Sequence, residues 1–98
     1  MIQRSVSPID RSGTTSGTIS TSTTLMAARS GRRGFSVQNQ HGSAAIYINE
    51  LGAAAVAGQP SIVIPAGATY TTPTGMASEQ AVTVLSATAS VPYAAREW

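Results

Sequence analysis

The chain contains no cysteine and no lysine, and it carries few charged residues of either sign. The absence of cysteine excludes a disulfide framework and a thiolate metal site. Charged residues make up 10% of the 98 residues, well below the roughly 25% of an average soluble domain. The surface must therefore consist mainly of small and uncharged polar residues. Such a surface suits a protein that is packed against copies or partners, where unpaired charge is costly.

Aromatic residues are also scarce, and much of the apolar content is alanine, which buries little area. A single domain of this length buries only about two-thirds of the surface that its unfolded chain exposes. We therefore expect the domain to gain stability from a homo-oligomer, with a trimer favoured, or from docking onto a larger assembly. Residues 1–8 lack the apolar run of a secretory signal, and residues 53–57 are too short to cross a bilayer. We expect assembly in a cytoplasm, without a membrane partner.

Short segments of alternating apolar residues, separated by Gly, Asn and Pro, predict an all-β fold. Phe35, Val37 and Asn39 share one face of such a segment, and Ile46 and Ile48 share a face of the next. Residues 51–59 predict a loop, because two glycines bracket only five residues between them. Further strands are expected at 62–64, 69–71, 79–87 and 91–98. This spacing predicts a small antiparallel β-sandwich or jelly-roll-like barrel over residues 25–98.

Residues 1–24 differ in composition from the rest. Twelve of the twenty residues from 5 to 24 are Ser or Thr, with no amphipathic period. This composition is typical of a flexible arm that becomes ordered when a partner offers a strand edge. We therefore expect an extended N-terminal arm over 1–24, with Ile9 and Ile19 as its candidate interface residues.

Little in the sequence could perform catalysis. The acids Asp10, Glu50, Glu79 and Glu97 are far apart in sequence, which favours scattered surface carboxylates over a catalytic pair. His41 is the only histidine and cannot form an ordinary zinc site without further ligands. We expect no metal, no cofactor and no enzymatic activity.

The cations are all arginine, and they cluster only at Arg29, Arg32 and Arg33. Phosphate binding needs several converging cations, so the sequence favours a solvated or interface-facing loop over a nucleic-acid site. Tyr47 and Tyr70 could stack on sugars, although a core, edge or interface position is favoured. The final residue, Trp98, either seals the open end of a sandwich or anchors a subunit interface, and both interpretations remain open. The arginines, both tyrosines and Trp98 are candidate interface residues.

Several short motifs occur together in this chain. They are Leu25-Met-Ala-Ala28, Arg33-Gly-Phe35, Val37-Gln-Asn39, Ile46-Tyr-Ile-Asn49, Pro60-Ser61, Ile64-Pro-Ala-Gly67 followed by Tyr70, and Arg96-Glu-Trp98. As a set they resemble small all-β virion proteins of tailed bacteriophages and prophages, over roughly residues 17–98. The resemblance implies a scaffold role for Arg33 and for the turn at Gly67, and it carries no catalytic residue.

The resemblance implies a capsid decoration or cement protein that binds the major capsid protein or other virion proteins, and is thus found in the virion. A tail, adaptor or fibre-base component is the alternative within the same setting. A small carbohydrate- or receptor-binding module is the alternative of a different class.

Overall fold

A computed structural model describes residues 8–16, 22–73, 75–86 and 90–98 of the chain. The strands are β1 (Ile9–Asp10), β2 (Gly13–Thr14), β3 (Thr23–Met26), β4 (Phe35–Asn39), β5 (Ile46–Asn49), β6 (Ile62–Ile64), β7 (Thr69–Thr71), β8 (Val82–Ser86) and β9 (Pro92–Glu97). None of the described residues lies in a helix. The prediction of an all-β fold is confirmed.

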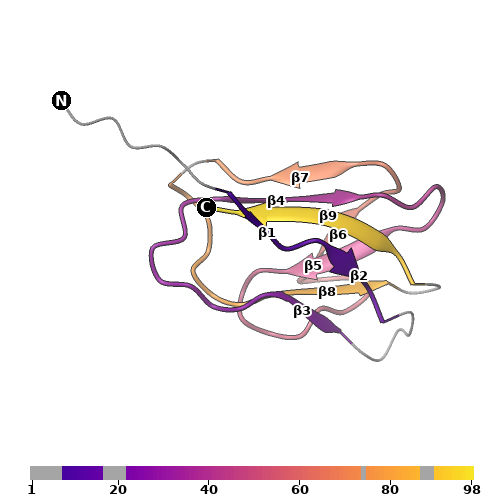
Figure 1. The fold of residues 1–98 in the computed structure, drawn as a ribbon. Coiled ribbons are helices and arrows are strands. Elements are labelled where there is room, and N and C mark those ends of the chain that lie inside the picture. The colour runs from indigo at the N-terminus through magenta and orange to yellow at the C-terminus, as the bar shows by residue number, and fades with distance from the viewer. Residues whose placement is uncertain (1–7, 17–21, 74, 87–89) are drawn as a thin grey trace.

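The strands form two antiparallel sheets (Figure 1). The β9 sheet has the order β1-β9-β4-β7, with β2 also paired to β9 further along the same edge. The β8 sheet has the order β3-β8-β5-β6. Consecutive strands along the chain repeatedly change sheet, so that β4 and β5 lie in different layers although only six residues separate them.

The alternation along each strand directs one set of side chains between the two sheets. From β4 these are Phe35, Val37 and Asn39, as predicted, and all three are fully buried. Ile46 and Ile48 from β5 are equally buried in the same apolar cluster. The core therefore lies between the two layers and consists mainly of aliphatic side chains, together with Phe35 and Tyr93.

Asn39 is a polar member of this interior, and it ties the two sheets together at one end. Its Nδ2 donates to the carbonyl oxygens of Ala44 (2.8 Å) and Ile64 (3.0 Å), and its Oδ1 accepts from the backbone N–H of His41. His41 in turn accepts backbone N–H groups at its Nδ1 and so organises the turn between β4 and β5. A buried amide with these partners is well satisfied.

Part of the expected N-terminal arm belongs to the β9 sheet. Ile9 pairs with Glu97, and Gly13 pairs with Tyr93, both in antiparallel register with β9. Thr15 is buried, and its Oγ1 lies 2.6 Å from Ser86 Oγ on the other sheet. The prediction of a separate arm over residues 1–24 is thus wrong for residues 9–15, because β9 offers them a strand edge within the same chain. Residues 1–7 and 17–21, which include Ile19, lie outside the described part.

The long connection between β5 and β6 passes over the outer face of the β8 sheet (Figure 1). The hydroxyl of Thr83, which alternation directs outward from β8, donates to the carbonyl oxygen of Ala53 in this connection at 2.8 Å. Leu85 also points outward from β8, yet it is almost fully buried. Residues 51–59 form no helix or strand, as predicted, and they add a partial third layer on this side.

Candidate functional site

Glu97, at the end of β9, is the centre of a charged cluster inside the molecule. Alternation along β9 places Tyr93, Ala95 and Glu97 on the inward face, and Glu97 is only 1% exposed. The prediction that all four acids lie on the surface is therefore wrong for Glu97. The position of this carboxylate could have been recognised from its two-residue spacing behind Tyr93 and Ala95.

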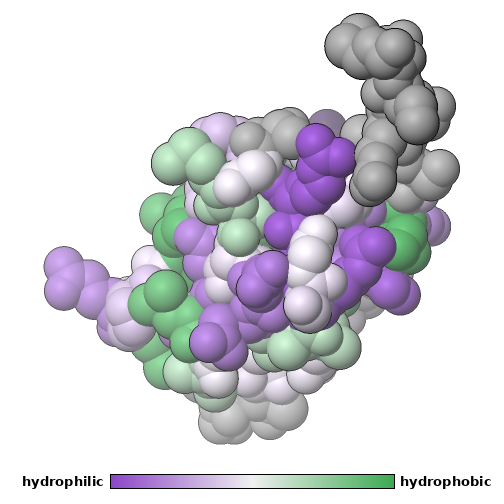
Figure 2. All heavy atoms as spheres, turned by 90° about the vertical axis from the view of Figure 1, so that its left-hand side faces the viewer, coloured by the Kyte–Doolittle hydropathy of each residue, from purple (hydrophilic) through white to green (hydrophobic). Residues whose placement is uncertain are grey.

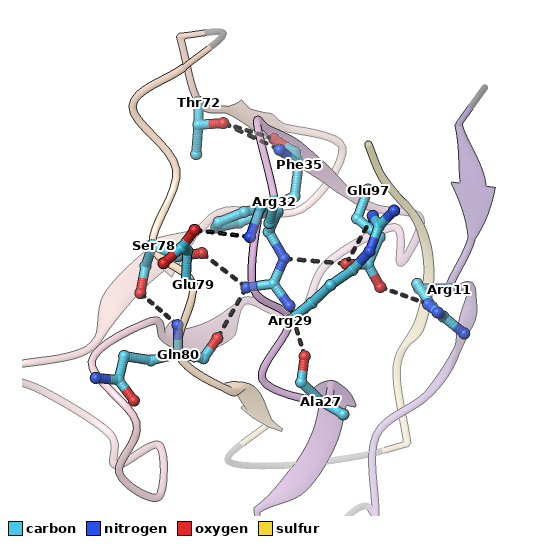
Figure 3. Close-up of polar contacts among 11 residues, drawn as sticks. Arg11, Ala27, Arg29, Arg32, Phe35, Thr72, Ser78, Glu79, Gln80 and Glu97 are labelled. Atoms are coloured by element: carbon cyan, nitrogen blue, oxygen red, sulfur yellow. Dashed lines mark hydrogen bonds and ion pairs between the residues drawn. The ribbon is translucent and has the colours of Figure 1, made fainter. Parts of the chain in front are cut away.

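Arg32 is the principal partner of this carboxylate. Its Nε donates to Glu97 Oε1 at 3.0 Å, and its side chain has no exposed surface (Figure 3). Its Nη1 donates to the carbonyl oxygens of Ser78 and Gln80 at 2.8 Å, and its Nη2 donates to that of Ala27 at 2.6 Å. One guanidinium thus holds together β9, the end of the β3 segment and the connection before β8.

Two further arginines approach Glu97 from the outer side (Figure 3). Arg11, which follows β1, donates through Nε to Glu97 Oε2 at 2.6 Å. Arg29 places Nη1 3.6 Å from Glu97 Oε1, too far for a hydrogen bond but close enough for an ion pair. The side chains of Arg11 and Arg29 are 41% and 40% exposed, respectively, so both connect the buried carboxylate to the surface.

The arginines favour the ionised form of Glu97. Burial alone would raise the pKa of its carboxyl group. Hydrogen bonds from Arg11 and Arg32, together with their positive charges, outweigh the burial and hold the pKa below its ordinary value. Glu97 is therefore a carboxylate at neutral pH, and it neutralises only one of the three guanidinium charges around it.

A pocket of about 250 Å³ opens beside this cluster. It is lined by Arg11, Arg29 and Glu97 and by residues 24–28, at the end of β3. The register of β3 against β8 shifts between Thr24 and Met26, so that neighbouring residues Leu25 and Met26 are both buried. The pocket thus lies between the free edge strands β1 and β3 of the two sheets. Figure 2 shows that hydrophilic residues gather at this end of the molecule.

The three arginines predicted to form one loop cluster have different roles in the structure. Arg32 is buried and fully engaged within the chain, so the prediction of a solvated or interface position is wrong for this residue. The cause is Glu97, whose carboxylate stabilises a guanidinium away from water. Arg29 is half-buried at the pocket, and Arg33 is exposed. Arg11 joins the cluster from a region that the sequence indicated to be an arm.

A second surface of interest is apolar, and we name Leu51, Val56 and Val63 the apolar face. They are 65%, 43% and 52% exposed, and they are three of the four exposed large hydrophobic residues in the described part of the chain. Leu51 and Val56 belong to the connection over the β8 sheet, and Val63 points outward from β6. Val63 pairs with Tyr47 of β5, which is half-buried on the same side.

The remaining candidate interface residues have contacts within the chain. Tyr70 packs against Phe35, with ring centroids 5.8 Å apart, and its hydroxyl donates to the carboxylate of Glu50 at 3.3 Å. The indole of Trp98 is half-buried and lies against Gly34, where a Cβ atom would come within 2.6 Å of the ring. Ile9 is half-buried on β1.

Within the described residues, no group of three or more His, Cys, Asp or Glu side chains is placed to hold a metal ion. No helix among these residues has the length and hydropathy that a membrane crossing requires. Comparison of the chain with protein-family models, with curated proteins and with solved structures gave no match.

Proposed function

We propose that this chain is a structural protein of a tailed-phage virion, and specifically a capsid decoration protein that binds and stabilises the assembled head. The observation that carries the proposal is the apolar face on a chain with only 10% charged residues. Apolar side chains that gather in one exposed patch are typical of a protein-protein docking surface, and we propose that Leu51, Val56 and Val63, which lie on β6 and in the connection before it, form such a patch. The two facing sheets support a β-sandwich, and a jelly-roll-like arrangement remains a prediction.

The proposed mechanism is stabilisation by mass action. A protein that binds the assembled shell, and not the free capsid subunits, shifts the equilibrium towards the shell. Val63 is 52% exposed, so burial of its remaining surface contributes about 1 kcal/mol. A homo-oligomer, for which a trimer fits the three-fold positions of a capsid lattice, would multiply the number of such contacts.

The direct test replaces Val63 by glutamate and measures occupancy on particles that lack the native protein. Val63 is exposed on a free edge strand, so Val63→Glu should leave the fold intact and place a charge in the docked surface. We expect the Kd for particles to rise by about tenfold or more, as the loss of about 1.4 kcal/mol predicts, so that occupancy falls at concentrations near the native Kd.

The matched control is Thr71→Glu, which adds the same charge at an exposed position on β7, the free edge strand of the other sheet. Its occupancy should equal that of the native chain. Full occupancy of Val63→Glu, with unfolding midpoints unchanged for both variants, would show that the apolar face is not the docking surface.

The role of the N-terminal segment is a separate part of the proposal. Residues 1–7 precede β1, and their removal leaves the Ile9–Glu97 pair and the Arg11–Glu97 ion pair in place. We expect the truncated chain to fold normally and to bind particles more weakly, because an added strand supplies main-chain hydrogen bonds to a neighbour. Unchanged occupancy after truncation would contradict a docking arm.

A tail, adaptor or fibre-base position is the alternative within the virion. Counting copies of the chain against the major capsid protein by quantitative mass spectrometry of particles separates the two locations. A carbohydrate-binding role depends on Tyr47, because Tyr70 is engaged with Phe35 and Glu50. Glycan binding that disappears in Tyr47→Ala would favour that role.

A further inference from the structure

The charged cluster has an excess of positive charge that the described chain does not compensate. Three guanidinium groups surround the single carboxylate of Glu97. Arg32 uses its donors on Glu97 and on three backbone carbonyl groups. Arg29 differs, because its buried Nη1 has no hydrogen-bond partner among the described residues. Among these residues its charge is met only by the 3.6 Å ion pair with a carboxylate that Arg11 and Arg32 also share, so the exposed part of this guanidinium group favours a further acceptor.

The adjoining pocket has the size of a side chain. Its volume of about 250 Å³ is below the roughly 300–1,000 Å³ of sites that enclose drug-sized ligands. Arg11 and Arg29 line it, together with Leu25 and Met26. A carboxylate on a short aliphatic stem matches this lining, because its oxygens would meet the guanidinium groups and its methylene groups the apolar side chains.

We propose that this pocket receives a glutamate or aspartate side chain from an acidic segment of a different protein. Arginine binds carboxylates through two parallel hydrogen bonds in a fixed planar geometry, which gives both affinity and specificity. The side chains of Arg29 and Arg11 are 40% and 41% exposed and both line the pocket, and Arg11 supplies the nitrogen atoms that its Nε bond to Glu97 leaves available.

A second copy of this chain is a poor source of the carboxylate. Asp10 accepts two hydrogen bonds from Ser12, and Glu79 accepts one from the backbone of Gly31. Glu50 accepts a hydrogen bond from the hydroxyl of Tyr70, and Glu97 is buried in the charged cluster itself. The four acids are also isolated from one another in the sequence, so a second copy offers no acidic segment, and charge complementarity points to another protein.

The neighbouring strand can hold the main chain of the same segment. β3 pairs with β8 along one side, and within the described residues its other side has no strand partner. β3 itself carries no charged residue that would repel an added strand. An extended acidic segment could therefore bond along β3 while one of its side chains enters the pocket. This inference deepens the proposed function by naming the chemistry of the partner.

The experiment titrates the full-length, isotope-labelled chain with a blocked six-residue peptide in which glutamate alternates with valine. Nuclear magnetic resonance follows the arginine Nε–Hε signals and the backbone amides of β3. We expect saturable shifts at Arg29, Arg11 and Met26. The same peptide with glutamine in place of glutamate should bind at least about tenfold more weakly, because hydrogen bonds to a charged group contribute about 1.5–3 kcal/mol.

Two variants locate the binding. Arg29→Gln should weaken binding by about tenfold or more while leaving the fold intact, because Arg29 contacts Glu97 only through a 3.6 Å ion pair and its side chain is 40% exposed. Arg33→Gln removes the same charge from an exposed neighbour that does not line the pocket, and binding should change by less than about twofold. Equal weakening in both variants would show diffuse attraction and overturn the proposal.

Two more results would overturn it. Equal binding of the glutamine peptide would show that the carboxylate is not recognised. Inorganic phosphate that shifts the same signals as strongly as the peptide would show a general anion site. Because the titration uses the isolated chain, peptide binding without decoration of particles would refute the proposed virion function alone.

Discussion

The replacement Glu97→Gln tests whether the buried charged cluster is a main source of stability. Glutamine has nearly the shape of glutamate, so the change removes the negative charge and little volume. Arg32 would keep its three carbonyl partners but would lose the counter-charge that its Nε contacts among the described residues. Arg11 and Arg29 would then face a buried positive charge with no carboxylate between them.

The magnitude follows from the complete burial of Arg32. Removing one partner of a buried ion pair leaves the other charge uncompensated and costs about 3–5 kcal/mol. The glutamine oxygen can still accept one hydrogen bond, so we expect the lower end, about 3 kcal/mol. Small domains have total stabilities of about 5–15 kcal/mol, so this change removes a large share. The expected fall in Tm is about 12–24 °C for a domain of this length.

The assay is urea and thermal unfolding at pH 7, followed by circular dichroism. Glu79→Gln is the matched control, because it makes the same chemical change at the same end of the molecule. Glu79 is exposed and accepts one backbone hydrogen bond from Gly31, at 2.7 Å. Its replacement should cost no more than about 1 kcal/mol. Stabilities of the two variants within about 1 kcal/mol of each other would refute the view that Glu97 compensates a buried charge.

Three further changes test other parts of the structure. Folding lowers the pKa of Glu97, so its carboxylate should contribute fully to the free energy of unfolding above pH 4.5, and this contribution should disappear as the pH falls through the pKa of the folded protein. Urea unfolding midpoints measured against pH should show this loss in the native chain and not in Glu97→Gln. Asn39→Ala should cost about 2–3 kcal/mol in urea unfolding, because the buried carbonyl group of Ile64 and the partly buried one of Ala44 lose their donor. A cost below about 0.5 kcal/mol would contradict the role of Asn39 in joining the sheets. Gly34→Ala should displace the indole of Trp98, shift its fluorescence to longer wavelength and cost about 1–3 kcal/mol, whereas Gly42→Ala, with open space around it, should change neither property.

The alternation of apolar residues was sufficient to predict the central strands. Phe35, Val37 and Asn39 could be placed on one buried face from their spacing alone, and Ile46 and Ile48 on another. The pairing of strands could not be predicted, because many arrangements of two sheets satisfy the same pattern. For this reason the sequence does not predict β1 and β2. The Ser- and Thr-rich segment that contains them has no apolar period, and they form strands because they pair with β9.

The sequence predicts only part of the candidate site. The sequence shows the cluster of arginines, but it does not predict the burial of Arg32, because an arginine in a Gly-containing loop is ordinarily solvated. The sequence predicts a surface position for Glu97, although this residue continues the inward face of β9 after Tyr93 and Ala95. Arg11 and Glu97 are 86 positions apart in sequence, and only the pairing of β1 with β9 brings them together.

The central position of β9 in its sheet also determines when the β9 sheet can form during synthesis. β9 lies between β1 and β4, and Glu97 at its end supplies the counter-charge for Arg11 and Arg32. During synthesis, β1 and β2 have no strand partner until residues 92–97 leave the ribosome. A chain interrupted before that point would expose the edge of β4 and an uncompensated arginine, and such a fragment would be a substrate for chaperones and proteases.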